Sequence, residues 1–231
     1  MRVQTQSPHP PNDFPEYGSS RLRAPRQPLH VLPGRLAELR SPLLAGETIG
    51  ALDHDLTRQH DAEPLGERIT INGRVLDEDG NPLAGTLVEV WQANAAGRYA
   101  HLSDQHPAPL DPNFSGAGRC LTDEDGNYRF ITIKPGAYPW RNHPNAWRPA
   151  HVHFSVFSPH FEQRLITQMY FPGDPLFVQD PVLNSVPEWA RERLIARWSL
   201  ELTEPEWSLG YAWDIVVAGR DATPLDDDAS E

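Results

Sequence analysis

Residues 151–157 read HVHFSVF, and this stretch decides the fold. Successive side chains of a β-strand point to opposite faces, so residues two apart share a face. His151, His153 and Ser155 therefore lie on one face, and the apolar residues between them lie on the other. The pattern predicts a strand whose apolar face packs into the core of a β-sandwich.

The same alternation predicts further strands on both sides of this stretch. They are expected at residues 67–76, 86–92, 128–133, 164–171 and 211–218. We therefore predict an all-β fold, an antiparallel β-sandwich with long loops, an extended N-terminal arm and one short helix.

The pentapeptide DEDGN occurs twice, at residues 77–81 and 123–127. Each copy lies beside a predicted strand, which favours hairpin turns. An EF-hand calcium loop would need glycine at its sixth position and glutamate at its twelfth, and neither copy has them. Ordinary turn chemistry accounts for both copies.

The short helix is expected at about residues 187–198, with Asn184 or Ser185 as its cap. Its apolar side chains recur every four residues, which predicts simple core packing. This stripe consists of Val186, Ala190, Leu194 and Trp198.

Three regions are expected along the chain: a proline-rich arm over 1–45, a sandwich domain over 46–220 and an acidic tail over 221–231. The arm is either disordered or packed on the body or on a partner subunit. Its apolar residues favour packing as much as disorder. They are Phe14, Tyr17, Leu29, Val31 and Leu32. The acidic run at 226–231 within the tail is expected to be solvated and frayed.

Composition excludes several classes of protein. The 231 residues carry 20 Lys and Arg against 32 Asp and Glu, a formal net charge of −12, which argues against a nucleic-acid surface. Cys120 is the single cysteine, so no intrachain disulfide forms. The N-terminus lacks the apolar core of a signal peptide, and no apolar run reaches the ~20 residues that cross a bilayer. We expect a cytoplasmic protein that binds neither membrane nor nucleic acid.

The chemistry is concentrated in the segments 134–142 and 147–154. Two imidazoles about 7 Å apart on one strand face can bind one metal ion. A bare His-x-His is more often two histidines without a ligand. Trp140, Trp147 and Pro149 flank the pair, which favours an enclosed site.

Two tyrosines lie in nearby loops, Tyr138 in the first of these segments and Tyr99 after a strand. Each alone would usually be a packing aromatic, and spacing does not decide between packing and ligation. Phenolates are hard anionic donors that favour Fe(III), whereas the common ferrous site uses two histidines and a carboxylate. A tyrosine with a pKa of about 10 would lose its proton to the charge of the metal.

Several segments together resemble the intradiol ring-cleavage dioxygenases. The resemblance rests on four segments, residues 89–99, 109–114, 134–142 and 147–154. It covers roughly residues 13–220 in all. That range includes two segments of the arm, residues 15–17 and 23–27. Catechol-type members carry a helical N-terminal segment. The proline-rich arm is unlike that segment and favours the protocatechuate type.

The resemblance implies one Fe(III) per chain. Its ligands would be Tyr99, Tyr138, His151 and His153. Tyr99 would remain on the metal, whereas Tyr138 would leave when substrate binds and would act in catalysis.

Further roles follow from the same resemblance. Arg148 would be catalytic and stabilise negative charge on the ring. Tyr17, Trp140 and Gln168 would bind substrate, with Gln168 on the oxygen side and Tyr17 near a substrate carboxylate. The implied partners are a catechol substrate, O2 and a homologous α subunit.

The implied reaction is cleavage of protocatechuate by O2 to 3-carboxy-cis,cis-muconate, in aromatic catabolism (the β-ketoadipate pathway). Alternatives are an intradiol dioxygenase for another catechol such as hydroxyquinol, a non-catalytic β-sandwich subunit, and a zinc hydrolase, which would want carboxylate or cysteine ligands. His143, Met169 and Ala137 depart from the usual pattern of the family. His143 leaves the choice of substrate open.

Overall fold

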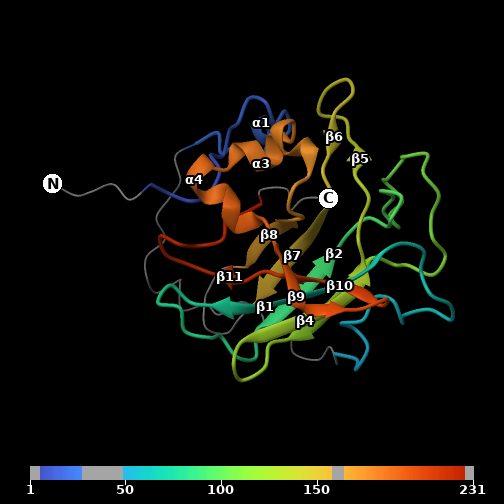
Figure 1. Cartoon of the computed structure of the whole chain (residues 1–231). Coiled ribbons are helices and arrows are strands. Elements are labelled where there is room, and N and C mark those ends of the chain that lie inside the picture. The colour runs from blue at the N-terminus through green and yellow to red at the C-terminus, as the bar shows by residue number, and fades with distance from the viewer. Residues whose placement is uncertain (1–5, 28–48, 158–163, 227–231) are drawn as a thin grey trace.

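The computed structural model describes residues 6–27, 49–157 and 164–226. The strands form two main sheets and a short two-stranded ribbon (Figure 1). The first sheet holds β1 (Arg68–Leu76), β4 (Asn127–Ile133), β9 (Arg197–Glu204), β10 (Ser208–Ala212) and β11 (Ile215–Val216). The second holds β3 (Ala117–Leu121), β2 (Leu87–Trp91), β7 (His151–Phe157) and β8 (Leu165–Tyr170), in that order. The ribbon pairs β5 (Tyr138–Pro139) with β6 (Trp147–Arg148).

The apolar faces of the two sheets enclose one core, as expected for a sandwich. Phe154 of β7 lies at the middle of it. Its ring centroid is 6.2 Å from that of Phe130 and 4.8 Å from that of Trp213. Val152 and Val156 are fully buried beside it, which confirms the predicted core face of this strand.

The sheets are mostly antiparallel, and the all-β sandwich is confirmed. β1 is the exception, because it pairs in parallel with β10 and β11 and antiparallel with β4. Two strands of the main sheets, β3 and β9, were not predicted. β3 reads AGRCL and has no apolar alternation. β9 reads RWSLELTE, in which Trp198, Leu200 and Leu202 do alternate with polar residues, but the four-residue stripe through Trp198 favours helix over the start of this segment.

The hairpin prediction for the two DEDGN turns is only partly borne out, because an antiparallel bridge joins Leu76 to Pro82 around the first turn but neither turn joins two strands of one sheet. The first turn leads from β1 in one sheet to β2 in the other, and the second leads from β3 back to β4. Both have the same local structure, because Asp77 accepts a hydrogen bond from the backbone N–H of Asn81 and Asp123 accepts one from that of Asn127, each at 2.8 Å. The turns thus connect the two layers.

The single helix predicted at 187–198 is only partly borne out, because helical turns cover residues 188–194 and end before Trp198. The region contains short helical segments instead, and Trp198 lies on β9, where it is exposed. The helical segments of the described chain are α1 (Ser20–Arg23), η1 (Pro175–Val178), α3 (Pro181–Ser185), α4 (Glu188–Arg191) and η2 (Glu192–Leu194). The other three stripe residues do pack together in a small core beside Tyr170.

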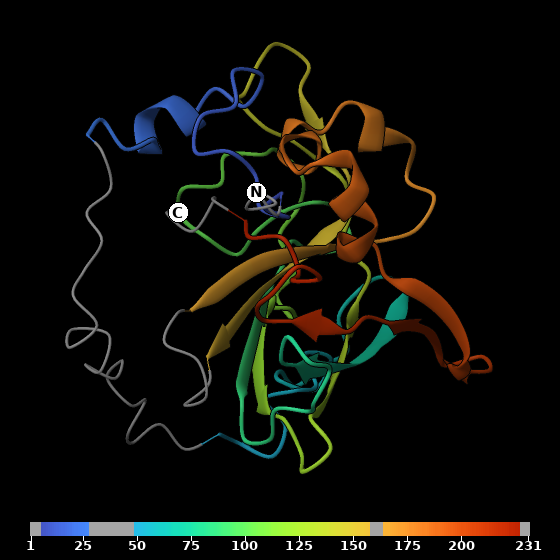
Figure 2. The ribbon, with the colours of Figure 1, turned by 90° about the vertical axis from the view of Figure 1, so that its left-hand side faces the viewer.

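The described part of the arm lies on the body of the same chain. Tyr17 and Ser20 are buried, and the backbone N–H of Gly18 donates to Asn142 Oδ1 at 2.8 Å. Figures 1 and 2 show this arm and the short helices gathered at one end of the sandwich. Its expected anchors at 29, 31 and 32 lie outside the described residues.

The expectation of a solvated tail is wrong for Asp226, the first residue of the acidic run at 226–231. Asp226 is buried, and its backbone N–H donates to the carbonyl of Ile166 on β8 at 2.7 Å. Residues 227–231 lie outside the described ranges. Within those ranges, the helices are all too short to span a bilayer.

Candidate metal centre

The outer face of β7 carries the two predicted histidine ligands. His151 and His153 are buried although they point away from the sandwich core. The strand register places His151 opposite Tyr170 on β8, and places His153 between Trp91 of β2 and Gln168 of β8. Neighbouring strands thus determine which side chains surround each imidazole.

The two tyrosines come from loops that pack backbone against backbone. The N–H of Gly136 donates to the carbonyl of Asn94 at 3.0 Å. A Cβ on Gly97 would collide with the Ala137 carbonyl, and one on Gly136 would collide with the backbone of Ala95. Glycine is needed at both positions because only hydrogen leaves space for this approach. The loops that carry Tyr99 and Tyr138 are thereby held side by side.

The side chains of Tyr99, Tyr138, His151 and His153 form one cluster, in which each side chain lies next to two of the others. The hydroxyl of Tyr138 is 3.2 Å from His151 Nε2, and the hydroxyl of Tyr99 is 3.2 Å from His153 Nε2. The imidazole centroids are 4.9 Å apart, and the tyrosine rings meet edge to face at 5.4 Å. Residues far apart in sequence therefore direct two oxygens and two nitrogens toward a common region.

His151 has the protonation state that metal binding needs. Its Nδ1 lies 2.7 Å from the carbonyl of Pro149, which can only accept, so Nδ1 carries the proton and Nε2 keeps its lone pair. Burial, followed by the charge of Arg148, holds the pKa of His151 well below its usual range. The ring is therefore neutral, as a ligand must be.

His153 is held differently. The indole of Trp91 stacks on its ring at 4.8 Å, with an interplanar angle of 5°. Its Nδ1 is buried and makes no hydrogen bond within the described part of the chain, and the Asp226 carboxylate is 3.5 Å away. That separation is longer than a hydrogen bond, so the contact is an electrostatic one. Burial alone would raise the pKa of Asp226, but the neighbouring His153, Arg148 and Gln168 lower it, so the carboxylate is ionised.

The donor set fits a hard metal ion. Ligand atoms about 2.1 Å from one ion and at right angles to each other are about 3 Å apart, close to the two oxygen–nitrogen distances of 3.2 Å found here. Among residues 6–27, 49–157 and 164–226, no group of three or more His, Cys, Asp or Glu could hold a metal. The oxygens that contact Nε2 of His151 and His153 within the described residues are the two tyrosine hydroxyls, a set unlike the carboxylate or cysteine ligands expected of a zinc hydrolase.

Arg148 is buried beside the cluster of two tyrosines and two histidines. Its Nη1 is 3.2 Å from His151 Nε2, and its Nη2 pairs with Asp180 at 3.1 Å. Burial would lower the pKa of Arg148, but Asp180, followed by Tyr170 and Tyr138, raises it well above its usual range. The cation also donates to Gln168 at 2.5 Å and to Tyr170 at 2.8 Å. A fixed positive charge thus stands next to the predicted ligands.

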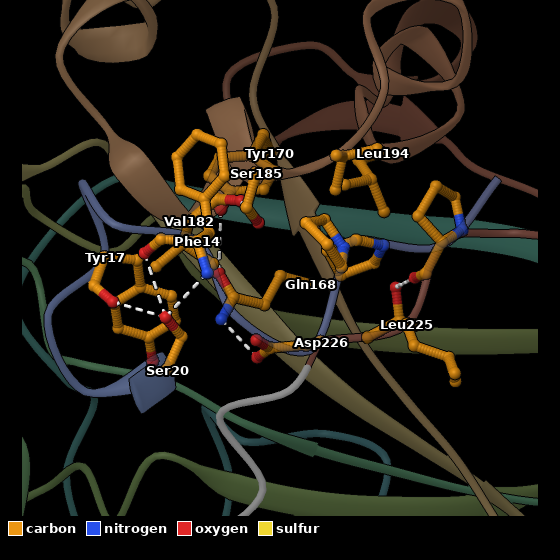
Figure 3. A pocket seen from close by; sticks show the side chains of 15 residues that line it. Phe14, Tyr17, Ser20, Gln168, Tyr170, Val182, Ser185, Leu194, Leu225 and Asp226 are labelled. Atoms are coloured by element: carbon orange, nitrogen blue, oxygen red, sulfur yellow. Dashed lines mark hydrogen bonds between the residues drawn. The ribbon is translucent and has the colours of Figure 1, made fainter. Parts of the chain in front are cut away.

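The remaining predicted residues join this network. Trp140 lies between Arg148, whose guanidinium carbon is 5.6 Å from the indole centroid, and Tyr17 of the arm, whose ring is 5.5 Å away. Figure 3 shows Tyr17 and Gln168 lining a pocket beneath the arm, with Asp226 beside Gln168. The structure therefore brings all predicted site residues together. His143 is exposed, and so is the expected flanking residue Trp147.

Four contributing residues were not predicted: Trp91, Tyr170, Asp180 and Asp226. Asp180 precedes Pro181, and this helix-start signal could have marked it as the N-cap of α3, where it accepts from Val182 N–H at 3.2 Å. Trp91 and Tyr170 lie beside the histidines because their strands pair with β7. Asp226 reaches the site because the C-terminal segment runs back along β8. No local pattern marks them.

The fold and the site together define a β-sandwich protein in which two tyrosine hydroxyls meet two buried histidines. Comparison with known proteins identifies the family. A family model described as dioxygenase matches residues 39–219, and one described as protocatechuate 3,4-dioxygenase beta subunit N terminal matches residues 3–35. The chain belongs to the intradiol ring-cleavage dioxygenase family.

Individual relatives agree with this assignment. The chain is 60% identical over 220 residues to the protocatechuate 3,4-dioxygenase beta chain of Burkholderia cepacia, covering 94% of each. It is 34% identical to the hydroxyquinol 1,2-dioxygenase of Rhizobium sp. (strain MTP-10005), covering 64% of this chain and 50% of that protein. The solved structure of 3-chlorocatechol 1,2-dioxygenase from Rhodococcus opacus 1CP shares the fold, with a TM-score of 0.57, 24% identity, and coverage of 79% of this chain and 75% of that one.

Proposed function

We propose that this chain binds one Fe(III) and cleaves protocatechuate with O2 to 3-carboxy-cis,cis-muconate, as a β subunit beside a homologous α subunit. The observation that carries the proposal is the cluster of two tyrosines and two histidines, in which each tyrosine hydroxyl lies 3.2 Å from a histidine Nε2. The similarity to the Burkholderia cepacia beta chain supports the choice of substrate and partner. A cytoplasmic location remains a prediction.

The proposed ligands are Tyr99, Tyr138, His151 and His153. Bound ferric iron would supply Lewis-acid chemistry, which draws electron density from a catechol held through its two adjacent oxygens. His151 is prepared for ligation by its donation to the Pro149 carbonyl.

Tyr138 is proposed to move during turnover, whereas Tyr99 remains a ligand. Tyr138 lies on the two-residue ribbon strand β5 and is only half-buried. Its Oη would be released as substrate enters and would take up a substrate proton. Tyr99 is anchored by its backbone N–H, which donates to Asp104 Oδ2 at 2.8 Å.

Arg148 is proposed to stabilise negative charge that develops on the ring. Its guanidinium is already oriented by Asp180, Gln168 and Tyr170, so little reorganisation is needed during the reaction. Gln168 would line the oxygen side. Trp140 and Tyr17 would hold the ring and its carboxylate, and the buried Trp140 Nε1 has no hydrogen-bond partner in the described part of the chain.

An oxygen-uptake assay of the iron-loaded chain, with and without a homologous α subunit, tests the proposal. We expect one O2 per protocatechuate, 3-carboxy-cis,cis-muconate as the product, and no yellow meta-cleavage product. A catechol panel containing hydroxyquinol tests the alternative substrate. Faster turnover of another catechol would contradict the substrate assignment, and inactivity of the iron-loaded complex on every catechol would contradict the function.

A further inference from the structure

The two proposed histidine ligands differ in what holds their second ring nitrogen. Nδ1 of His151 has a backbone carbonyl at 2.7 Å. Nδ1 of His153 is buried and has no hydrogen bond among the described residues, although a buried N–H without an acceptor is costly. Its imidazole therefore needs an acceptor that the strand itself does not provide.

Asp226 is placed to be that acceptor. Its Oδ2 lies 3.5 Å from His153 Nδ1, and its carboxylate also accepts a hydrogen bond from Gln168 Nε2. Figure 3 shows Asp226 facing Gln168 from the C-terminal segment. A shift of less than about 1 Å would bring the His153 contact to hydrogen-bond length.

The position of Asp226 is determined by its backbone. Its N–H donates to Ile166 at 2.7 Å, the Thr167 hydroxyl donates to the Pro224 carbonyl at 2.7 Å, and Leu225 N–H donates to His9 Nδ1 of the arm at 3.3 Å. The segment thus runs along β8 and is fixed from both sides. A buried carboxylate held in this way fits a defined role better than a frayed acidic tail.

We propose that Asp226 is a positioning residue that accepts the Nδ1 proton of His153 and so orients its Nε2 toward the metal. This inference rests on the proposed function, since it assumes that His153 binds iron. A cation on Nε2 makes Nδ1–H a stronger donor, which draws the carboxylate contact to hydrogen-bond length. The carboxylate in turn makes the imidazole a more basic ligand.

Iron binding by matched variants of the full chain, assembled with its α partner if assembly requires one, tests this role. Wild type, Asp226→Ala, Asp226→Asn and Asp221→Asn are loaded with ferric citrate. Loss of iron to a chelator and the visible tyrosinate-to-iron charge-transfer band are then recorded. Asp221 is the control, because it is an exposed carboxylate in the same segment and pairs only at the surface, with Arg193 at 2.8 Å.

We expect Asp226→Ala to bind iron about 10–100-fold more weakly. Its charge-transfer band should move to longer wavelength, because a less basic His153 leaves the ferric ion a stronger Lewis acid. Asp226→Asn should show the same changes to a smaller degree, since an amide oxygen accepts a hydrogen bond without a charge. Asp221→Asn should match wild type. A merely structural role would change stability without shifting the band.

Wild-type affinity and an unshifted band in the Asp226 variants would overturn the inference and leave the proposed function intact. If Asp226→Ala does not fold, Asp226→Asn decides, because it keeps the shape of the side chain. A wild-type chain without a charge-transfer band would contradict the proposed function itself, and this inference with it.

Discussion

The two faces of strand β7 are equally buried but differ in chemistry. On one face Val152, Phe154 and Val156 pack only against apolar groups of the sandwich core. On the other face His151 and Ser155 are as deeply buried, yet they are surrounded by polar side chains. Burial alone therefore does not separate core from site. What separates them is that the polar side chains on the second face contact other polar groups, among them Arg148, Tyr99 and Glu89.

The largest effect on stability should come from breaking the core face. Phe154→Ala removes the ring that bridges the two sheets and should lower the free energy of unfolding by about 3–5 kcal/mol. Urea denaturation of the iron-free chain measures it. Leu200→Ala, at an exposed position, should change the free energy by less than about 0.5 kcal/mol. Equal effects at the two positions would contradict the assignment of the core.

A loss of similar size should come from the site face. Asp180→Ala leaves the Arg148 guanidinium buried without its counter-ion, which should cost about 3–5 kcal/mol. The exposed pair between Arg193 and Asp221 is the matched comparison, and Asp221→Ala should cost no more than about 1 kcal/mol. Thermal unfolding of both variants measures the difference. If Asp180→Ala is as harmless as Asp221→Ala, the site face does not depend on buried charge pairing.

A smaller loss of stability, with a marked effect on the metal centre, is expected where the tyrosine loops meet. Gly136→Ala places a methyl group against the backbone of Ala95 and Gly97, which should cost about 1–3 kcal/mol and separate the loops. The charge-transfer band of the iron-loaded variant should weaken. Gly18→Ala is the control, because its methyl group would meet only Asn142 Oδ1 at 3.4 Å. An unchanged band in Gly136→Ala would show that loop packing does not position the tyrosines.

The smallest effect concerns Cys120, a thiol that packs on the core side of β3. Burial raises its pKa from 9.0 to about 11. The unfolded chain loses the thiol proton first, so this contribution to stability is complete below a pH of about 9 and is lost as the pH rises through about 11. The folded chain should have an about 100-fold lower thiolate fraction near neutral pH and react correspondingly slowly with iodoacetamide. Alkylation at the rate of a denatured control would show that this part of the core face is open to water.

Local patterns predicted the β7 face and most strands, because alternation is a property of neighbouring residues. Long-range pairing decided the rest. The periodic stripe through Trp198 predicts helix, but Arg197–Glu204 pairs with β10 and continues as strand. Asp226 was assigned to a solvated acidic tail, since nothing in its neighbourhood indicates that the chain returns along β8 to reach His153.

In the site too, local patterns predicted some residues and long-range contacts determined the others. The His-x-His spacing indicated a shared face, but only the resemblance to a family indicated the two tyrosines. Their loops are joined through glycine contacts between residues about forty positions apart, Gly97 and Gly136. Such contacts leave no periodic signal in the sequence.

The central claim is that both tyrosines and both histidines bind one ferric ion. The visible spectrum of the iron-loaded chain tests it most directly, recorded for wild type, Tyr99→Phe, Tyr138→Phe and the double variant. We expect a charge-transfer band that each single substitution shifts or weakens and that the double substitution abolishes. A band that survives unchanged in the double variant would contradict it.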